Sequence, residues 1–135
     1  MSVPERPADV AAGWMRYADV DMQFAWFGVG RAELQDMAAF HAQQAIEKAL
    51  KAMCVAKRIG FDKTHDLARL LGNVRAFAPE FAEEWRHVDQ ITEYAVTSRY
   101  PVEVGGRAVE PPAAVALAEQ FLKAVQRWFA EQPEV

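Results

Sequence analysis

The chain has 135 residues, of which 52% are hydrophobic and 25% charged, as in a single globular domain and not in a disordered segment. Its net charge of −4 excludes unspecific attraction to DNA or to an acidic membrane, so that any nucleic-acid contact must be local. Cys54 is the one cysteine, which excludes an intrachain disulfide and a cysteine-based zinc site. We therefore expect residues 1–135 to form one soluble, cytoplasmic domain without a membrane span.

Two long helices are predicted in the first half of the chain. Apolar residues recur at three- and four-residue steps from Ala8 to about Phe27, which predicts an amphipathic helix that stops at the glycines of the next segment. Arg31 to Lys57 contains no Gly or Pro and is rich in strong helix formers, so this helix should be the longest. It carries a stripe of small residues that lets a neighbouring helix approach closely: Ala42, Ala45, Ala49, Ala52 and Ala56.

Three further helices are predicted in the second half. Thr64 is the expected N-cap of a short helix that runs from His65 to about Phe77. A fourth helix opens at Pro79 and continues to Arg99, because Pro101 disfavours helical geometry in the residue before it.

The last helix starts near Pro112, after a loop that begins at Val102, and ends before Pro133. No convincing strand remains. The pattern predicts an all-α, up-and-down bundle of four to five helices, four of them long.

One side of the long second helix is polar. Gln44, Glu47 and Lys51 align at three- and four-residue steps, whereas Lys48 is rotated away from them. They could line a ligand groove in which Lys51 meets a phosphate and the Gln44 amide reads a base or sugar edge. The alternative is a solvated helix face whose Glu47–Lys51 pair contributes about 0.2–0.5 kcal/mol.

His65, Arg99 and Tyr100 are the other candidate binding residues. His65 could donate a hydrogen bond to a phosphate or a carbonyl, or it could hold its turn against the long helix. Arg99 and Tyr100 at a helix end could present a planar guanidinium and a stacking ring to a ligand. Alternatively, Arg99 caps the last carbonyls of its helix and Tyr100 packs beneath it.

No metal or cofactor is expected, because His41 and His87 have no second ligand at metal-binding spacing. The four tryptophans fall on apolar helical stripes, which favours core or dimer contacts over base stacking; they are Trp14, Trp26, Trp85 and Trp128. With eight phenylalanines in addition, the chain has more aromatic surface than a small bundle readily hides. We therefore predict a homodimer.

Three separated blocks of the chain resemble the HEPN family. They are residues 40–51 (FHAQQAIEKALK), 64–67 (THDL) and 97–101 (TSRYP), and the resemblance runs from about Trp14 to the final helix. It implies a bundle of four to five helices that is usually a homodimer and is often encoded beside, or fused to, a minimal nucleotidyltransferase. Some members are linked to nucleotide binding.

Other members of that family are metal-independent ribonucleases with an Arg, four to six intervening residues and a His. At the corresponding distances after Arg99 this chain has Val104, Gly105 and Gly106, and the one pair with suitable spacing, Arg58 and His65, flanks a turn. The resemblance thus favours a non-catalytic module that binds a nucleotide, a nucleotidyltransferase partner or both. The alternatives are a ribonuclease toxin of a toxin–antitoxin pair and a purely structural assembly subunit.

Overall fold

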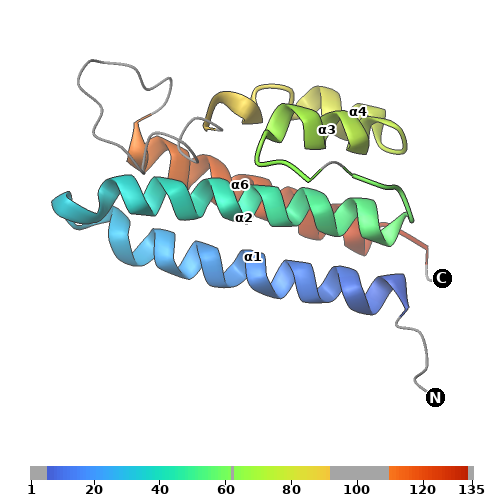
Figure 1. Ribbon diagram of the computed structural model, residues 1–135, viewed down its shortest axis with the longest axis horizontal. Helices are drawn as coiled ribbons and strands as arrows, with labels where there is room; N and C mark the ends of the chain where they lie inside the picture. The colour runs from blue at the N-terminus through green and yellow to red at the C-terminus, as the bar shows by residue number, and fades with distance from the viewer. Residues whose placement is uncertain (1–5, 62, 92–109, 134–135) are drawn as a thin grey trace.

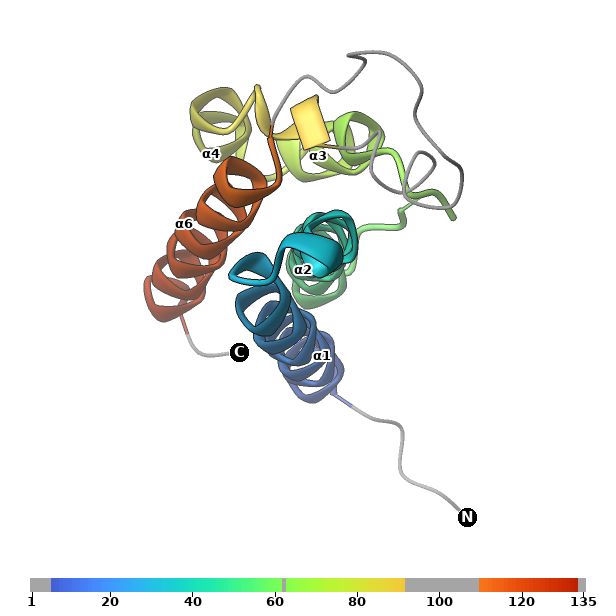
Figure 2. The ribbon, with the colours of Figure 1, turned by 90° about the vertical axis from the view of Figure 1, so that its left-hand side faces the viewer.

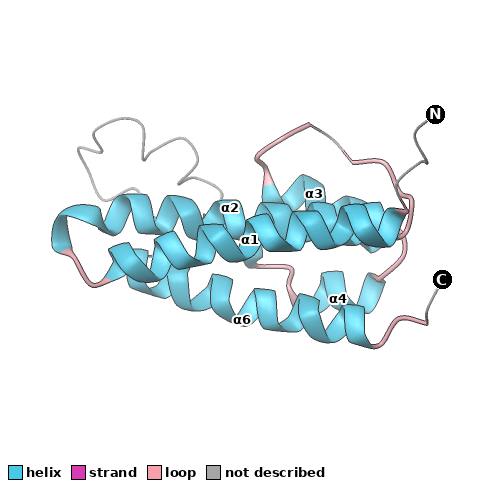
Figure 3. Cartoon of the chain, turned by 90° about the horizontal axis from the view of Figure 1, so that it is seen from below, coloured by secondary structure: helices cyan, strands magenta, loops and turns pink. Residues whose placement is uncertain are grey.

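The computed structural model describes residues 6–61, 63–91 and 110–133, the coloured parts of Figure 1. This part of the chain contains five α-helices: α1 (Pro7–Val29), α2 (Gln35–Ala56), α3 (Leu67–Arg75), α4 (Pro79–Glu84) and α6 (Pro111–Ala130). Two short 3₁₀ helices join them, η1 (Ala32–Leu34) and η2 (Val88–Ile91). The described residues include no strand (Figure 3), which confirms the all-α prediction.

The helix α2 lies at the centre of the bundle. It packs antiparallel to α1 and also contacts α6 and α3, while α1 makes its own contacts with α6. The short helices α3 and α4 pack on each other above α2 and α6 (Figure 2). Within the described ranges, no helix is both long and apolar enough to cross a membrane.

Small side chains allow α1 and α2 to approach closely. Four alanines of the predicted stripe are fully buried, while Ala56 at the end of α2 is only partly buried. At the α1–α2 turn, a Cβ added to Gly28 would lie 3.2 Å from the Cβ of Ala38 and 3.2 Å from the carbonyl oxygen of Leu34. The glycine is therefore needed for this close contact between the two helices.

Aromatic rings attach the shorter helices to α6. The ring of Phe121 is fully buried and lies 5.7 Å from the ring of Phe81 and 5.2 Å from the ring of Trp85, both in edge-to-face arrangements. Farther along α6, the rings of Trp128 and Phe77 lie 5.8 Å apart. Such contacts contribute stability beyond area burial and hold α4 against α6.

The predicted N-cap of the third helix was wrong. Helix α3 begins at Leu67, and its N-cap is Asp66, whose carboxylate accepts hydrogen bonds from the backbone N–H groups of Ala68 and Arg69. The Thr64 hydroxyl instead accepts a hydrogen bond from the Asp66 N–H at 3.0 Å. Thr64 thus orders the turn that places the cap, and Asp66 satisfies the first free N–H groups of the helix.

The prediction of one long fourth helix was also wrong. Helix α4 ends at Glu84, and after a turn the chain forms η2, with a 3.0 Å bond from the Val88 N–H to the Trp85 carbonyl. Three described helices are long instead of four, since α3 has nine residues and α4 six. The remainder of the predicted helix, beyond residue 91, lies outside the described residues.

Candidate functional site

A buried carboxylate organises the polar side of α2. Glu47 is only 3% exposed, although it is a charged residue. One carboxylate oxygen accepts a hydrogen bond from Lys51 Nζ at 3.0 Å, and the other lies 2.8 Å from His65 Nδ1. A buried carboxylate requires such donors to offset its lost hydration. Nδ1 of His65 is therefore assigned as the protonated nitrogen, and Nε2 points away from Glu47.

Gln43 extends this cluster. Its side chain is fully buried, and its amide nitrogen donates to the backbone carbonyl of His65 at 3.0 Å and to Glu47 at 3.5 Å. Its amide oxygen accepts a hydrogen bond from Gln44 at 2.8 Å. The amide of Gln43 thus fixes the turn at His65 against α2, which is the structural role that the sequence allowed for His65.

Lys51 is enclosed on two sides. Its side chain is 12% exposed, and its ammonium group lies 5.6 Å from the ring centroid of Trp14 and 5.7 Å from that of Phe61. Together with the salt bridge to Glu47, these rings stabilise the cation in place. The His65 side chain, in contrast, is 59% exposed.

The structure brings four of the six predicted site residues together: Gln44, Glu47, Lys51 and His65. The alternative of a solvated helix face was wrong, because Glu47 and the neighbouring Gln43 are buried. The other two, Arg99 and Tyr100, lie outside the described residues. We call Gln43, Gln44, Glu47, Lys51 and His65 the Glu47 cluster.

A second buried carboxylate joins α1 to α2. Asp21 is 6% exposed; one of its oxygens lies 2.9 Å from His41 Nδ1, and the other accepts a hydrogen bond from Lys48 Nζ. Sequence reasoning missed Asp21, although a carboxylate on the same face as Ala18 and Ala25 signals a buried ion pair. Lys48 is turned away from the Glu47 cluster, as its helical position predicted.

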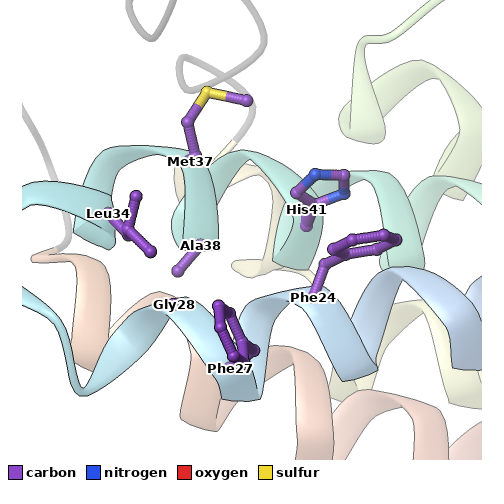
Figure 4. A pocket seen from close by; sticks show the side chains of 7 residues that line it. All are labelled: Phe24, Phe27, Gly28, Leu34, Met37, Ala38 and His41. Carbon is purple, nitrogen blue, oxygen red and sulfur yellow. The ribbon is translucent and has the colours of Figure 1, made fainter.

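An apolar hollow lies beside His41, where α1 and α2 approach their turn (Figure 4). Its volume is about 220 Å³, and its lining residues are Phe24, Phe27, Gly28, Leu34, Met37, Ala38 and His41. The His41 ring stacks on Phe24 with centroids 4.9 Å apart. The side chains of Phe24, Phe27 and Met37 remain about half exposed, so this hollow is an open apolar surface and not part of the core.

The tryptophans divide into two groups. Trp14, Trp85 and Trp128 are partly buried and pack on other rings, as expected for core contacts. Trp26 is 50% exposed and is not a core residue.

Among the described residues, no group of three or more His, Cys, Asp or Glu side chains is arranged to hold a metal ion. The Arg58–His65 pair is also divided. The His65 ring is bound to Glu47, whereas Arg58 lines a separate cavity between α1 and α6.

The helical bundle with buried polar clusters on its central helix agrees with the family that the sequence resembles. The family model for the HEPN domain matches residues 11–128, which is nearly the whole chain. The chain therefore belongs to the HEPN family. Comparison with curated proteins gave no significant match. Comparison with solved structures gave none either.

Proposed function

We propose that this protein is a non-catalytic HEPN module that acts as a homodimer and binds a nucleotide, a minimal nucleotidyltransferase or both. The observation that carries the proposal is the Glu47 cluster. Residues from α2 and from the turn before α3, 18 positions apart in sequence, meet around one buried carboxylate. Buried polar groups away from a protein's ends are costly to stability and are frequently found at functional sites.

The chemistry of the cluster suits a polar ligand. Glu47 binds His65 Nδ1, so Nε2 is available at the surface as an acceptor in the neutral ring and as a donor in the protonated ring. A nucleotide offers both base N–H donors and phosphate acceptors to such a group. Arg99 and Tyr100 would add a guanidinium fork and a stacking ring.

A ribonuclease is the second candidate, and the Glu47–His65 pair favours it. A carboxylate that orients a histidine can prepare the ring for general-base catalysis. Cleavage of RNA without metal also needs a cation that stabilises the charge on the phosphorane. The nearby cation, Lys51, is already bound to Glu47 and enclosed by two rings, which supports the non-catalytic proposal.

The proposed homodimer is supported by an exposed apolar stripe on α1. Its members follow one face of the helix and are between 46% and 65% exposed; they are Tyr17, Val20, Phe24 and Phe27. Met37 of α2 continues the stripe across the apolar hollow. A large contiguous apolar patch on a soluble protein commonly marks an interface.

The test is calorimetric titration of ATP, and of a nucleotidyltransferase encoded beside the protein, into wild type and Arg99→Ala. We expect the substitution to weaken binding by about tenfold to a hundredfold, because a charge-assisted hydrogen bond contributes about 1.5–3 kcal/mol. The melting temperature should stay unchanged. Arg69→Ala is the matched control, since Arg69 is an exposed arginine on α3.

A large fall in melting temperature with unchanged affinity would show that Arg99 is a structural cap. Absence of binding to both ATP and the nucleotidyltransferase would contradict the proposed function.

A further inference from the structure

A second, larger cavity lies between α1 and α6, at the end of the bundle where α1 begins and α2 and α6 end (Figure 1). Its volume is about 860 Å³, within the range of about 300–1,000 Å³ found for small-molecule sites. Met15 of α1 and Phe129 of α6 contribute apolar walls, and the turn that follows α2 lines the cavity with Lys57 and Arg58. The Glu47 cluster contributes no residue to it.

The charges around this cavity are mainly positive. Arg6, Arg16, Lys57 and Arg58 line it, and Asp19 is the one acidic residue in the lining. This concentration of cations stands out on a chain of net charge −4. The field of such a cavity attracts anions locally even though the whole protein is acidic.

Two of these arginines are available to a ligand. Arg6 forms a salt bridge with Asp9 at 3.1 Å, and Lys57 Nζ lies 5.6 Å from the ring centroid of Trp128. The side chains of Arg16 and Arg58 are exposed and make no hydrogen bond or ion pair within the described part of the chain. They come from different helices, so they can reach a ligand from two sides of the cavity.

The backbone at Arg58 is unusual. Its φ angle is 57°, the one positive φ of a non-glycine residue in the described ranges. The Ile59 N–H bonds to the Cys54 carbonyl at 2.9 Å and the Arg58 N–H to the Val55 carbonyl at 3.1 Å, the hydrogen-bond pattern of a Schellman motif. Glycine is the preferred residue at this position because a Cβ is unfavourable there. Residues held in such conformations occur disproportionately at functional sites.

We propose that this cavity binds a small organic phosphate with a planar apolar group. The guanidinium groups of Arg16 and Arg58 bind the phosphate oxygens, because their planar forks match phosphate geometry. Met15 and Phe129 cover the planar group. The inference goes beyond the proposed function, since it assigns a ligand to a cavity that is separate from the Glu47 cluster.

Stabilisation of a helix end is the competing explanation for part of this charge. Cations near the C-terminal end of α2 interact favourably with the helix dipole, which would account for Lys57 and Arg58. It does not account for Arg16 in the middle of α1, nor for an arginine at a position that favours glycine. The two explanations predict opposite effects of Arg58→Gly on stability.

The experiment is calorimetric titration of adenosine monophosphate into the full chain, with adenosine and inorganic phosphate as partial ligands. We expect each partial ligand to bind at least about tenfold more weakly, because it lacks either the charged or the planar contact. Arg16→Gln and Arg58→Gly should each weaken binding of adenosine monophosphate at least about fivefold through loss of a charge-assisted hydrogen bond. Asp19→Asn should tighten it about threefold by removing the like charge.

Stability is measured on the same variants. Arg58→Gly should melt at the same temperature as wild type or higher, because glycine relieves the backbone strain. The control Arg69→Gln removes an exposed arginine elsewhere and should leave binding unchanged.

Three results would overturn the inference. The first is absence of adenosine monophosphate binding to wild type, and the second is a lower melting point of Arg58→Gly with unchanged affinity. The third is loss of binding in His65→Ala but not in Arg16→Gln or Arg58→Gly. That third result would place the ligand at the Glu47 cluster and leave the proposed function standing. The reverse pattern would support this cavity and remove the nucleotide from the Glu47 cluster.

Discussion

Glu47 is the residue on which the polar cluster of α2 depends. Glu47→Ala would leave Lys51 and Gln43 without their buried acceptor, and removal of one partner of a buried pair costs about 3–5 kcal/mol. We expect a loss of at least about 3 kcal/mol in the free energy of unfolding measured with urea. Glu119→Ala, which removes an exposed carboxylate 3.7 Å from Lys123, should cost less than about 0.5 kcal/mol. Equal effects of the two variants would contradict the importance of the cluster.

Cys54 is fully buried, and burial raises the pKa of its thiol to about 11. At pH 8 about one thiol in a thousand is ionised, so native Cys54 should resist iodoacetamide under conditions in which the unfolded chain reacts. The unfolded thiol ionises near pH 9 and the folded thiol near pH 11. This group's contribution to stability is therefore complete below pH 9 and decreases as the pH rises toward 11.

Mass spectrometry after alkylation measures the reactivity of Cys54. Rapid labelling of the native protein would show that the thiol is accessible. Cys54→Ala should lack the part of the alkaline stability loss that is due to the thiol.

At the residue scale, the sequence predicted part of the site. Gln44, Glu47 and Lys51 could be grouped because helical spacing alone places them on one side of α2. Gln43 and Asp21 could not be found in this way, because their burial depends on the turn at His65 and on the packing of α1 against α2. Whether a polar helix face is solvated or covered is decided by tertiary contacts that lie far apart in sequence.

Among the elements, α3 offers a direct test of its N-terminus. Asp66→Ala removes the side chain that accepts from Ala68 and Arg69, and loss of such a cap typically costs about 1 kcal/mol. Asp66→Asn should retain most of the stability, and Thr64→Val should cost less than Asp66→Ala. Urea unfolding of the three variants measures these differences. A larger loss for Thr64→Val would show that the threonine is the more important group.

The long helices were predicted more accurately than the short ones. Sustained apolar periodicity identified α1, α2 and α6 to within a few residues of their ends. Between Pro79 and Ile91 the apolar residues also recur at three- and four-residue steps, but a three-residue step fits a 3₁₀ turn equally well. Packing of Phe81 and Trp85 on Phe121 of α6 is a tertiary effect that the local pattern does not contain.

For the whole molecule, the exposed stripe on α1 leads to a prediction of its oligomeric state. Wild type should have the mass of a dimer by light scattering at micromolar concentration. Phe27→Glu should shift it toward the monomer, because a charge would be placed in the apolar hollow of the interface. Trp26→Glu is the matched control: it changes a similarly exposed ring on α1 that does not line the hollow. A monomeric mass of wild type across a tenfold dilution would contradict the dimer.

The central claim is that this HEPN protein binds its ligand or partner without cleaving RNA. The most direct measurement is incubation of the purified, tag-free protein with a mixed RNA substrate in the presence of a chelator, beside His65→Ala. General acid–base catalysis contributes about 10²–10⁴ in rate, so a protein without a complete catalytic pair should leave the RNA intact. We predict no cleavage by either protein. Cleavage by wild type that disappears in His65→Ala would contradict the claim and make the Glu47–His65 pair part of a ribonuclease site.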